Sequence, residues 1–307
     1  MRIFLTGGQG MVGKNFSEHS AVKDHKIFAP SSQELDLRNF DSVLNWIESI
    51  KPDIVVHCAG RVGGIQANIS NPVAYLVDNL DIGRNVIGAA RKFGVKNLLN
   101  LGTSCMYPRS AENPLREGMI LAGELEHTNE GYALAKITAA KLCEFIGRED
   151  SSYYYKTIVP CNIFGRYDKF DPLLSHLVPA IIHKIHLAKT RGATTVDIWG
   201  SGNARREFLY AGDLADFMWR ALENFETLPP LMNVGIGADF SILDYYRAVA
   251  GVIGYSGDFV FDLSKPEGMP QKLVSIDKLK NWGWKSRTSL EEGISKTYEF
   301  YLETIKV

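Results

Sequence analysis

The stretch RIFLTGGQGMVGKNF, residues 2–16, decides the fold class of this chain. A mostly apolar run leads into three glycines, Gly7, Gly10 and Gly13, and a helical pattern follows them. A G-x-x-G-x-x-G loop of this kind allows a tight turn and lets backbone N–H groups approach a pyrophosphate at the positive end of a helix. Its position between a strand and a helix favours a dinucleotide-binding loop over a merely structural turn.

Short apolar runs alternate with helical patterns through the first half of the chain. We expect strands at 2–6, 25–29, 53–59, 97–103 and 156–164, with helical stretches such as 39–50 and 79–94 between them. Strands that are apolar on both faces and alternate with helices predict an α/β fold with a Rossmann-type, doubly wound parallel sheet.

After about residue 165 the pattern changes to turn-rich pieces mixed with helices near 175–190, 212–225 and 241–253. We therefore expect a dinucleotide-binding domain over 1–165 and a smaller C-terminal substrate-binding lobe over most of 166–307. A segment near 207–235 is expected to return to the sheet.

The composition excludes several classes of protein. The 307 residues include 34 Lys and Arg against 35 Asp and Glu, so no charge excess favours nucleic-acid binding. The four cysteines lack the paired spacing of a disulfide framework or zinc site, and His183 and His186 lack an acidic partner motif, so we expect no metal. No apolar run approaches the ~20 residues of a membrane span. We expect a cytoplasmic protein with no membrane partner.

The residues after the second expected strand bear on the choice between NAD and NADP. Ala29, Pro30, Ser31 and Ser32 occupy the place where an acidic residue would bind the ribose 2′-hydroxyl of NAD. No carboxylate there repels a 2′-phosphate, so we expect NADPH. The cofactor-binding set that we expect is Gly7, Gly10, Met11, Val12, Gly13, Ser31, Ser32, Asp36, Leu37, Ala59, Gly60, Lys136, Asn162 and Ile163.

Tyr132 and Lys136 lie four residues apart in NEGYALAKI, on one face of an expected helix. A lysine beside a phenol is expected to lower the pKa of the phenol, which makes the tyrosine a usable acid near neutral pH. Together with the glycine loop, this pair resembles the signature of short-chain dehydrogenases/reductases. In the extended branch of that family a third hydroxyl follows a central strand, which here corresponds to LGTSCMYP, 101–108.

Further segments narrow the resemblance to the GDP-L-fucose synthase family, which epimerises and reduces GDP-4-keto-6-deoxymannose. These segments are AGRVGGIQAN (59–68), LGTSCMYP (101–108), LEHTNEGYALAKI (125–137), SHLVPA (175–180), WGSGNARREFLY (199–210) and SKPEGMPQKL (264–273). The resemblance implies reduction at carbon 4 with epimerisation at carbons 3 and 5, with NADPH as the cofactor and a homodimer as the assembly.

The resemblance also implies residue roles. Thr103 takes the place of the carbonyl-binding hydroxyl, Tyr132 that of the acid, and Lys136 that of the residue holding the nicotinamide ribose. Cys105 and His176 match the epimerising pair. The implied substrate-binding residues are Lys184, Trp199, Arg206 and Lys272.

Departures from the family pattern keep two alternatives open. Lys184 and Gln271 stand where arginines are usual, and Gly131 stands where a larger residue is usual before Tyr132. These changes could widen the sugar end of the site, which suits a carbon-4 reductase for a related GDP-4-keto sugar such as a heptose, with reduced or no epimerase activity. The other alternative is a non-catalytic NADP-sensing protein of the same fold, although such a protein would not need Thr103, Tyr132 and Lys136 together.

Overall fold

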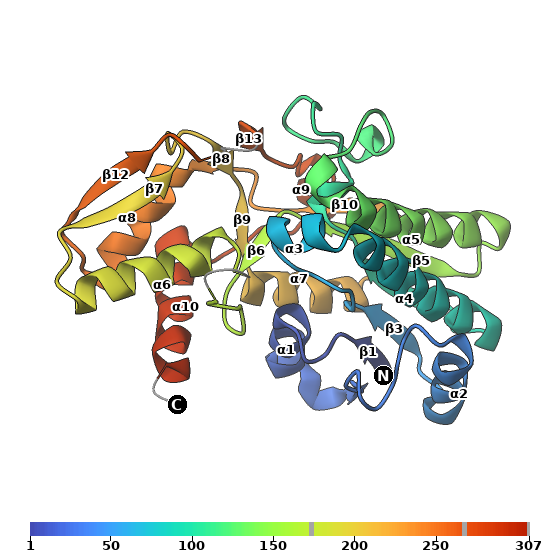
Figure 1. The fold of residues 1–307 in the computed structure, drawn as a ribbon. Helices are drawn as coiled ribbons and strands as arrows, with labels where there is room; N and C mark the ends of the chain where they lie inside the picture. The colour runs from blue at the N-terminus through green and yellow to red at the C-terminus, as the bar shows by residue number, and fades with distance from the viewer. Residues whose placement is uncertain (172–174, 266–268, 306–307) are drawn as a thin grey trace.

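The computed structural model describes residues 1–171, 175–265 and 269–305 (Figure 1). The strands are β1 (Arg2–Thr6), β2 (Lys26–Phe28), β3 (Ile54–His57), β4 (Asn97–Leu101), β5 (Tyr154–Pro160), β6 (Asn162–Phe164), β7 (Thr195–Trp199), β8 (Arg205–Arg206), β9 (Phe208–Tyr210), β10 (Leu231–Val234), β11 (Phe240–Ser241), β12 (Asp258–Asp262) and β13 (Gln271–Lys272). The α-helices are α1 (Met11–Glu18), α2 (Phe40–Ile50), α3 (Ile65–Ser70), α4 (Pro72–Phe93), α5 (Glu130–Glu149), α6 (Leu177–Thr190), α7 (Ala211–Glu223), α8 (Ile242–Ile253), α9 (Asp277–Trp282) and α10 (Leu290–Thr304). Four 3-10 helices are η1 (Ser20–Asp24), η2 (Ser104–Met106), η3 (Glu117–Met119) and η4 (His127–Asn129).

Six strands form one parallel sheet in the order β10-β5-β4-β3-β1-β2. The chain moves outward from β1 to β2 and then crosses back to β3, so the strand order reverses between β1 and β3. In doubly wound sheets, ligands bind at this reversal, outside the carboxyl ends of the strands. The expected parallel α/β architecture is confirmed.

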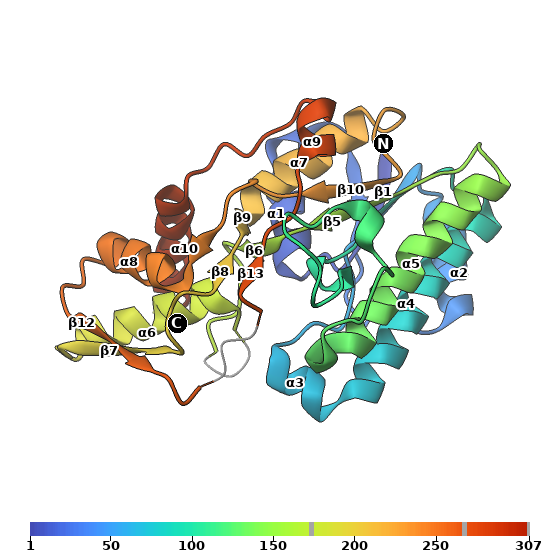
Figure 2. The ribbon, with the colours of Figure 1, turned by 90° about the horizontal axis from the view of Figure 1, so that it is seen from above.

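Helices cover both faces of the sheet (Figure 2). On one face α2, α4 and α5 bury apolar residues such as Val43, Ile87 and Ala139 against Val55 and Leu98 of the strands. On the other face α7 packs against α1, where the rings of Phe16 and Trp219 stack at 4.4 Å. Because both faces are covered, the strands are apolar on both sides, as their sequences indicate.

A second hydrophobic cluster holds the C-terminal lobe together. Helices α6, α8 and α10 pack on one another and on the two-stranded sheet β7–β12, with Ile182, Tyr245 and Tyr301 fully buried. The lobe also contains a small sheet of order β11-β8-β13. None of the helices in the described ranges has both the length and the apolar character of a membrane span.

The segment near 207–235 returns to the sheet through one strand only. Strand β10 pairs in parallel with β5, with Leu231 opposite Thr157. Strand β9 pairs instead with β6, with Phe208 opposite Asn162. The run expected as one strand over 156–164 is thus two strands, and β6 leads the chain from the sheet into the lobe.

Candidate active site

The glycine loop is the tightest point of the site. Gly7 has a φ of +73°, and a Cβ atom built on it would lie 2.8 Å from the backbone nitrogen of Ala59. A Cβ on Gly13 would lie 2.3 Å from the carbonyl oxygen of Gly7. Glycine is therefore required at both positions, and the loop after β1 lies directly against the segment after β3.

Helix α1 begins immediately after this loop. Its N-cap residue Gly10 supplies no side-chain hydrogen bond, so Met11 and Val12 start a helix whose first N–H groups have no side-chain cap. Such a helix start, approached by a glycine-lined backbone, fits a pyrophosphate. The residues present therefore fit a dinucleotide at the reversal of strand order.

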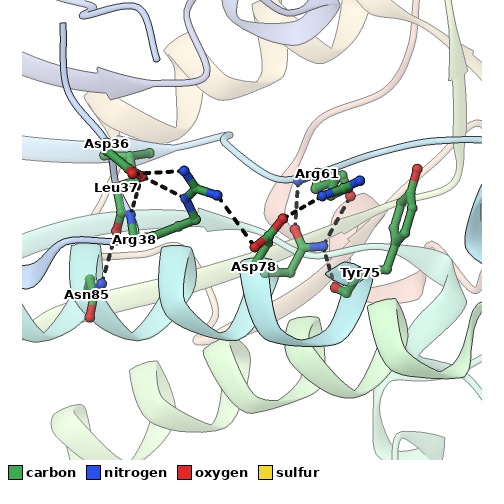
Figure 3. A network of polar contacts seen from close by, with 8 residues as sticks. Asp36, Leu37, Arg38, Arg61, Tyr75, Asp78 and Asn85 are labelled. Carbon is green, nitrogen blue, oxygen red and sulfur yellow. Dashed lines mark hydrogen bonds and ion pairs between the residues drawn. The ribbon is translucent and has the colours of Figure 1, made fainter. Parts of the chain in front are cut away.

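The segment after β2 carries an arginine that the sequence reasoning missed. Arg38 donates to both carboxylate oxygens of Asp36 at 2.9 Å, and Asp36 is expected to contact the cofactor (Figure 3). Ser31 lies in a turn, where its hydroxyl accepts from the backbone N–H of Glu34 at 3.3 Å. The hydrogen bonds from Arg38 lower the pKa of Asp36. The signal was present, because Arg38 follows Asp36 by only two residues.

Asp78 of α4 joins this segment to the one after β3. It lies 3.7 Å from Arg38 and 2.7 Å from Arg61 (Figure 3). The backbone of Arg61 is held in turn by Asn79, whose Oδ1 accepts from its N–H at 2.8 Å. In addition, Asn85 donates to the carbonyl of Leu37 at 3.1 Å. Helix α4 thus fixes both loops that flank the reversal of strand order.

Lys136 lies close to the expected cofactor residues Ala59 and Gly60. A Cβ on Gly60 would be 3.6 Å from Lys136 Nζ, which donates to the carbonyl of Leu101 at 3.0 Å. Burial lowers the pKa of Lys136 to about 8. Asn162 and Ile163 lie on β6, where Asn162 Nδ2 donates to the carbonyl of Glu207 at 3.0 Å.

Thr103 and Tyr132 are brought together at the carboxyl end of β4, and the Thr103 hydroxyl is hydrogen-bonded to the phenol. The pKa of Tyr132 is raised, because burial and the nearby Cys105 sulfur outweigh that hydrogen bond. The net shift of the Tyr132 pKa is therefore opposite to the one expected from Lys136. Lys136 is buried with its ammonium on the Leu101 carbonyl, and it does not offset the desolvation of the phenol.

Cys105 is half-buried, and its sulfur faces two nitrogen donors. Asn129 Nδ2 donates to Sγ at 3.3 Å, and Lys272 Nζ lies 3.6 Å from it. The Cys105 backbone N–H donates to Thr103 Oγ1 at 3.3 Å. The sulfur borders a cavity of about 30 Å³ lined by Ser104, Cys105, Tyr107, Leu115, Glu126, Asn129, Met269 and Lys272. Asn129 was missed by the sequence reasoning, although it directly precedes the tyrosine helix.

A larger cavity of about 210 Å³ adjoins Tyr132. It lies between α3, the first turn of α4 and the start of α5, and its lining is Asn68, Ile69, Pro72, Tyr75, His127, Thr128, Asn129, Glu130, Gly131 and Tyr132. Asn129 borders both cavities, so it separates the sulfur from this larger space.

Gly131 does not widen the sugar end of the site in the way that was expected. A Cβ on this residue would lie 3.1 Å from the carbonyl oxygen of Pro72 and 3.2 Å from Leu76 Cβ. The missing side chain thus faces α4 and allows α4 and α5 to approach closely. The glycine is therefore explained by helix packing and does not support a larger sugar.

The expected substrate residues of the lobe occupy several places. Arg206 of β8 lies opposite Lys272 of β13, and partial burial lowers the pKa of Arg206. Trp199 is 62% exposed and has Lys265 Nζ 5.5 Å from its ring centre. Lys184 forms an ion pair with Asp197 at 2.7 Å.

His176 occupies the N-cap position of α6, but its side chain makes no capping hydrogen bond in the described structure. His176 as a whole residue is exposed. Desolvation of the imidazole by the atoms around it, followed by the charge of Lys169, lowers the pKa of His176. In the described part of the chain, no hydrogen bond or ion pair connects His176 with Cys105, Thr103 or Tyr132. The structure therefore groups Thr103, Tyr132, Cys105 and Lys136 and places His176 on the lobe.

Glu207 is a third residue that the sequence reasoning missed. This fully buried carboxylate accepts from the backbone N–H groups of Ile236 and Gly237 at 2.7 Å and of Val274 at 2.9 Å. It connects β10 and β13 to the strand end that carries Arg206. Burial raises the pKa of Glu207 to about 7, against the effect of these hydrogen bonds.

Gln271, which replaces a usual arginine, donates to Asp239 at 2.6 Å, and Asp239 also pairs with Arg205 at 2.8 Å. No group of three or more metal-ligating side chains is found among residues 1–171, 175–265 and 269–305. His183 and His186 are instead hydrogen-bonded to Tyr301 and Tyr298 of α10.

Comparisons with known proteins agree with this geometry. Residues 3–235 match the NAD dependent epimerase/dehydratase family. The chain is 52% identical to the GDP-L-colitose synthase of Yersinia pseudotuberculosis, covering 98% of each chain. It is 49% identical to the GDP-L-fucose synthase of Azorhizobium caulinodans, covering 98% of this chain and 96% of that one. Among solved structures, the GDP-mannoheptose C4 reductase of Campylobacter jejuni with NADP bound superposes with a TM-score of 0.89 at 30% identity, covering 98% of each chain.

Proposed function

The chain belongs to the NAD dependent epimerase/dehydratase family, and we propose that it reduces carbon 4 of a GDP-4-keto-6-deoxy sugar after epimerising carbons 3 and 5. It is an oxidoreductase acting on nucleotide sugars. The observation that carries the proposal is the grouping of Thr103, Tyr132 and Cys105 at the end of β4, because it combines two carbonyl-directed hydroxyls with a thiol.

The cofactor is NADPH, which supplies the hydride for carbon 4. The glycine loop and the start of α1 fit its pyrophosphate, and Lys136 fits the nicotinamide ribose. We assign the 2′-phosphate to the segment of Ser31, Ser32 and Arg38, where Arg38 supplies the only arginine within 31–38. On this proposal residues 1–165 bind mainly cofactor, and 166–307 bind mainly nucleotide sugar.

The proton chemistry follows from the side chains. A 4-ketone acidifies the hydrogens on carbons 3 and 5, and removing one places negative charge on the carbonyl oxygen. Thr103 and Tyr132 stabilise that oxygen by donating hydrogen bonds to it. Cys105 takes the proton, and His176 returns one from the opposite face. In the reduction step Tyr132 protonates the oxygen, and Lys136 stabilises the phenolate that remains.

The names of the relatives suggest two other candidate substrates. L-colitose lacks the 3-hydroxyl of L-fucose, so a colitose-type substrate would need inversion at carbon 5 alone. The relative at 52% identity favours this candidate. A GDP-4-keto heptose has the support of the structural neighbour at 30% identity but not of Gly131, which faces α4.

The test is incubation with NADPH and each candidate GDP-4-keto sugar in deuterated water, with NMR analysis of the product. We expect NADPH oxidation and solvent label at carbons 3 and 5, or at carbon 5 alone for the 3-deoxy sugar. The Tyr132→Phe variant should lose reduction by roughly 10²–10⁴-fold, the usual contribution of a general acid. No NADPH oxidation with any of these sugars would refute the proposal.

We also propose a homodimer formed through α4 and α5. These helices lie side by side on one face of the sheet (Figures 1 and 2). They expose Val73 (72%), Val77 (45%), Leu134 (38%) and Phe145 (54%), which a partner helix pair would cover. The four free thiols suit a reducing compartment, and we propose the cytoplasm.

A further inference from the structure

Asn129 departs from the usual behaviour of its position. It is the N-cap residue of α5, where asparagine is favoured because its oxygen accepts a first-turn N–H, a bond worth about 1 kcal/mol. Here the side chain makes no cap bond, and Oδ1 is buried without a hydrogen-bond partner in the described structure. The amide instead donates from Nδ2 to Cys105 Sγ at 3.3 Å. The side chain at the capping position thus donates to a sulfur atom and not to the helix.

Lys272 reaches the same sulfur from the lobe. Its Nζ lies 3.6 Å from Sγ, and Lys272 is on β13. Both Lys272 and Asn129 are far from Cys105 in the sequence and are brought next to it by folding. An N–H donor and an ammonium group both favour the thiolate over the thiol. The other titratable groups facing the sulfur are Tyr132 and, across the small cavity, Glu126 and Tyr107. Glu126 Oε1 is occupied by the N–H and hydroxyl of Thr128 at 3.4 Å.

We infer that Asn129 is a positioning residue that, with Lys272, holds Cys105 Sγ as the thiolate base of the epimerisation. This inference rests on the proposed function. The thiolate takes the proton from the carbon beside the ketone and becomes a thiol, while the C–H electron pair moves into the enolate. Protonated His176 then returns a proton to that carbon on the opposite face, and both side chains exchange protons with solvent.

The placement of Asn129 also couples the base to the acid. Asn129 precedes Tyr132 by three residues at the start of the same helix, so a bond from Asn129 to Cys105 fixes the sulfur relative to the phenol. An amide gives this support without adding a second cation.

The test is the rate of Cys105 alkylation by iodoacetamide, measured against pH on the full chain without substrate. We expect Asn129→Ala to slow alkylation at pH 7 roughly tenfold, the loss typical of one hydrogen bond to a charged group, and to move the pH profile upward. Asn129→Asp, which has the same shape but adds negative charge, should slow it further. Cys105→Ser should remove the fast reaction, because burial raises the pKa values of Cys58, Cys143 and Cys161.

Two controls separate this role from helix capping. Asn71→Ala alters the N-cap asparagine of α4, which also makes no cap bond, and should leave alkylation unchanged. Asn129→Ser keeps a good capping residue but cannot present an amide, so it should retain thermal stability and still react slowly. Wild-type alkylation rates in both Asn129→Ser and Asn129→Asp would overturn the inference.

The two proposals can fail separately. Asn129→Ala should slow the entry of solvent deuterium at the epimerised carbons, leave KM unchanged and spare reduction of an already epimerised ketone. If the pH profile of Cys105 alkylation moves in Asn129→Ala but wild-type protein exchanges no deuterium with any candidate sugar, the epimerase function is wrong. The role of Asn129 at the Cys105 sulfur is then still supported. If wild-type protein epimerises but the profile is unmoved, the role of Asn129 is wrong.

Discussion

At the scale of single residues, the site is governed by desolvation. Lys136 is buried, and its pKa is lowered to about 8, while burial raises the pKa of Tyr132. The phenol therefore stays protonated through the neutral range and is ready to donate. Lys136 is the group in this pair that changes charge near the pH at which an enzyme of this kind is assayed.

We expect kcat/KM for NADPH oxidation to fall above about pH 8, because Lys136 then loses the proton that stabilises the phenolate. The sign follows from the direction of the shift: the cation is present below the lowered pKa and is lost as pH rises through it. In Lys136→Arg, which keeps its charge, the alkaline limb should disappear even if the rate is lower. A pH–rate profile checks this, and an unchanged limb in Lys136→Arg would assign it to another group.

At the scale of elements, the glycine loop separates two requirements that the sequence shows as one motif. Gly13 has no room for a side chain, because its Cβ would meet the backbone of Gly7 and Gly8 at 2.3 and 2.6 Å. A Cβ on Gly10 would meet only the Gly7 oxygen, at 3.4 Å. Gly13 is therefore required by the fold of the chain itself, whereas Gly10 leaves space for a ligand.

We therefore expect Gly13→Ala to destabilise the chain by about 1–3 kcal/mol, as overpacking does, even without cofactor. Gly10→Ala should cost less, about 0.5–1 kcal/mol, because alanine is a poorer N-cap residue than glycine, but it should weaken NADPH binding. Urea unfolding of the free proteins and fluorescence titration with NADPH distinguish the two effects. Equal stability loss in both variants would contradict this division.

Glu207 is the element-scale link between the sheet and the lobe. Its pKa is raised by burial from the ordinary 4.5 to about 7, so the folded protein binds more protons than the unfolded one between these values. Its contribution to stability is full below about pH 4.5 and is lost as pH rises through 7.

In Glu207→Gln this titration is absent. The free energy of unfolding of wild type relative to the variant should therefore drop by roughly 3 kcal/mol between pH 4.5 and 8, since each pKa unit corresponds to about 1.4 kcal/mol. Urea denaturation of both proteins across that range measures the difference. The Asp168 carboxyl, whose pKa burial also raises to about 7, is present in both proteins and cancels. A difference that is flat with pH would show that Glu207 is ionised throughout.

At the scale of the whole molecule, the sheet and the lobe meet at the sulfur of Cys105. The 3-10 helix η2, which follows β4, supplies Cys105, the N-cap position of α5 supplies Asn129, and β13 of the lobe supplies Lys272. The proposed base is thus complete only when the lobe is in place. Helices α4 and α5, which expose Val73, Val77, Leu134 and Phe145, form the proposed dimer interface.

Introducing a charge into that surface tests the assembly. We expect Phe145→Asp to yield monomers in sedimentation velocity, because burying an unpaired carboxylate at an interface is costly. Leu263→Asp is the matched control: Leu263 is 73% exposed but lies on the lobe, beyond β12, so it should not change the assembly. A wild-type monomer would refute the proposed dimer directly.

The sequence by itself determined the alternation of strands and helices through the first half of the chain, the glycine loop and the Tyr132–Lys136 spacing. Each of these depends on periodicity or on neighbours within a few residues, which a linear pattern records. Tertiary structure decided which side chains surround Cys105, that Asp78 joins Arg38 to Arg61, and that Gly131 faces α4. It also reversed the expected pKa shift of Tyr132, because desolvation depends on the atoms that folding brings from distant parts of the chain.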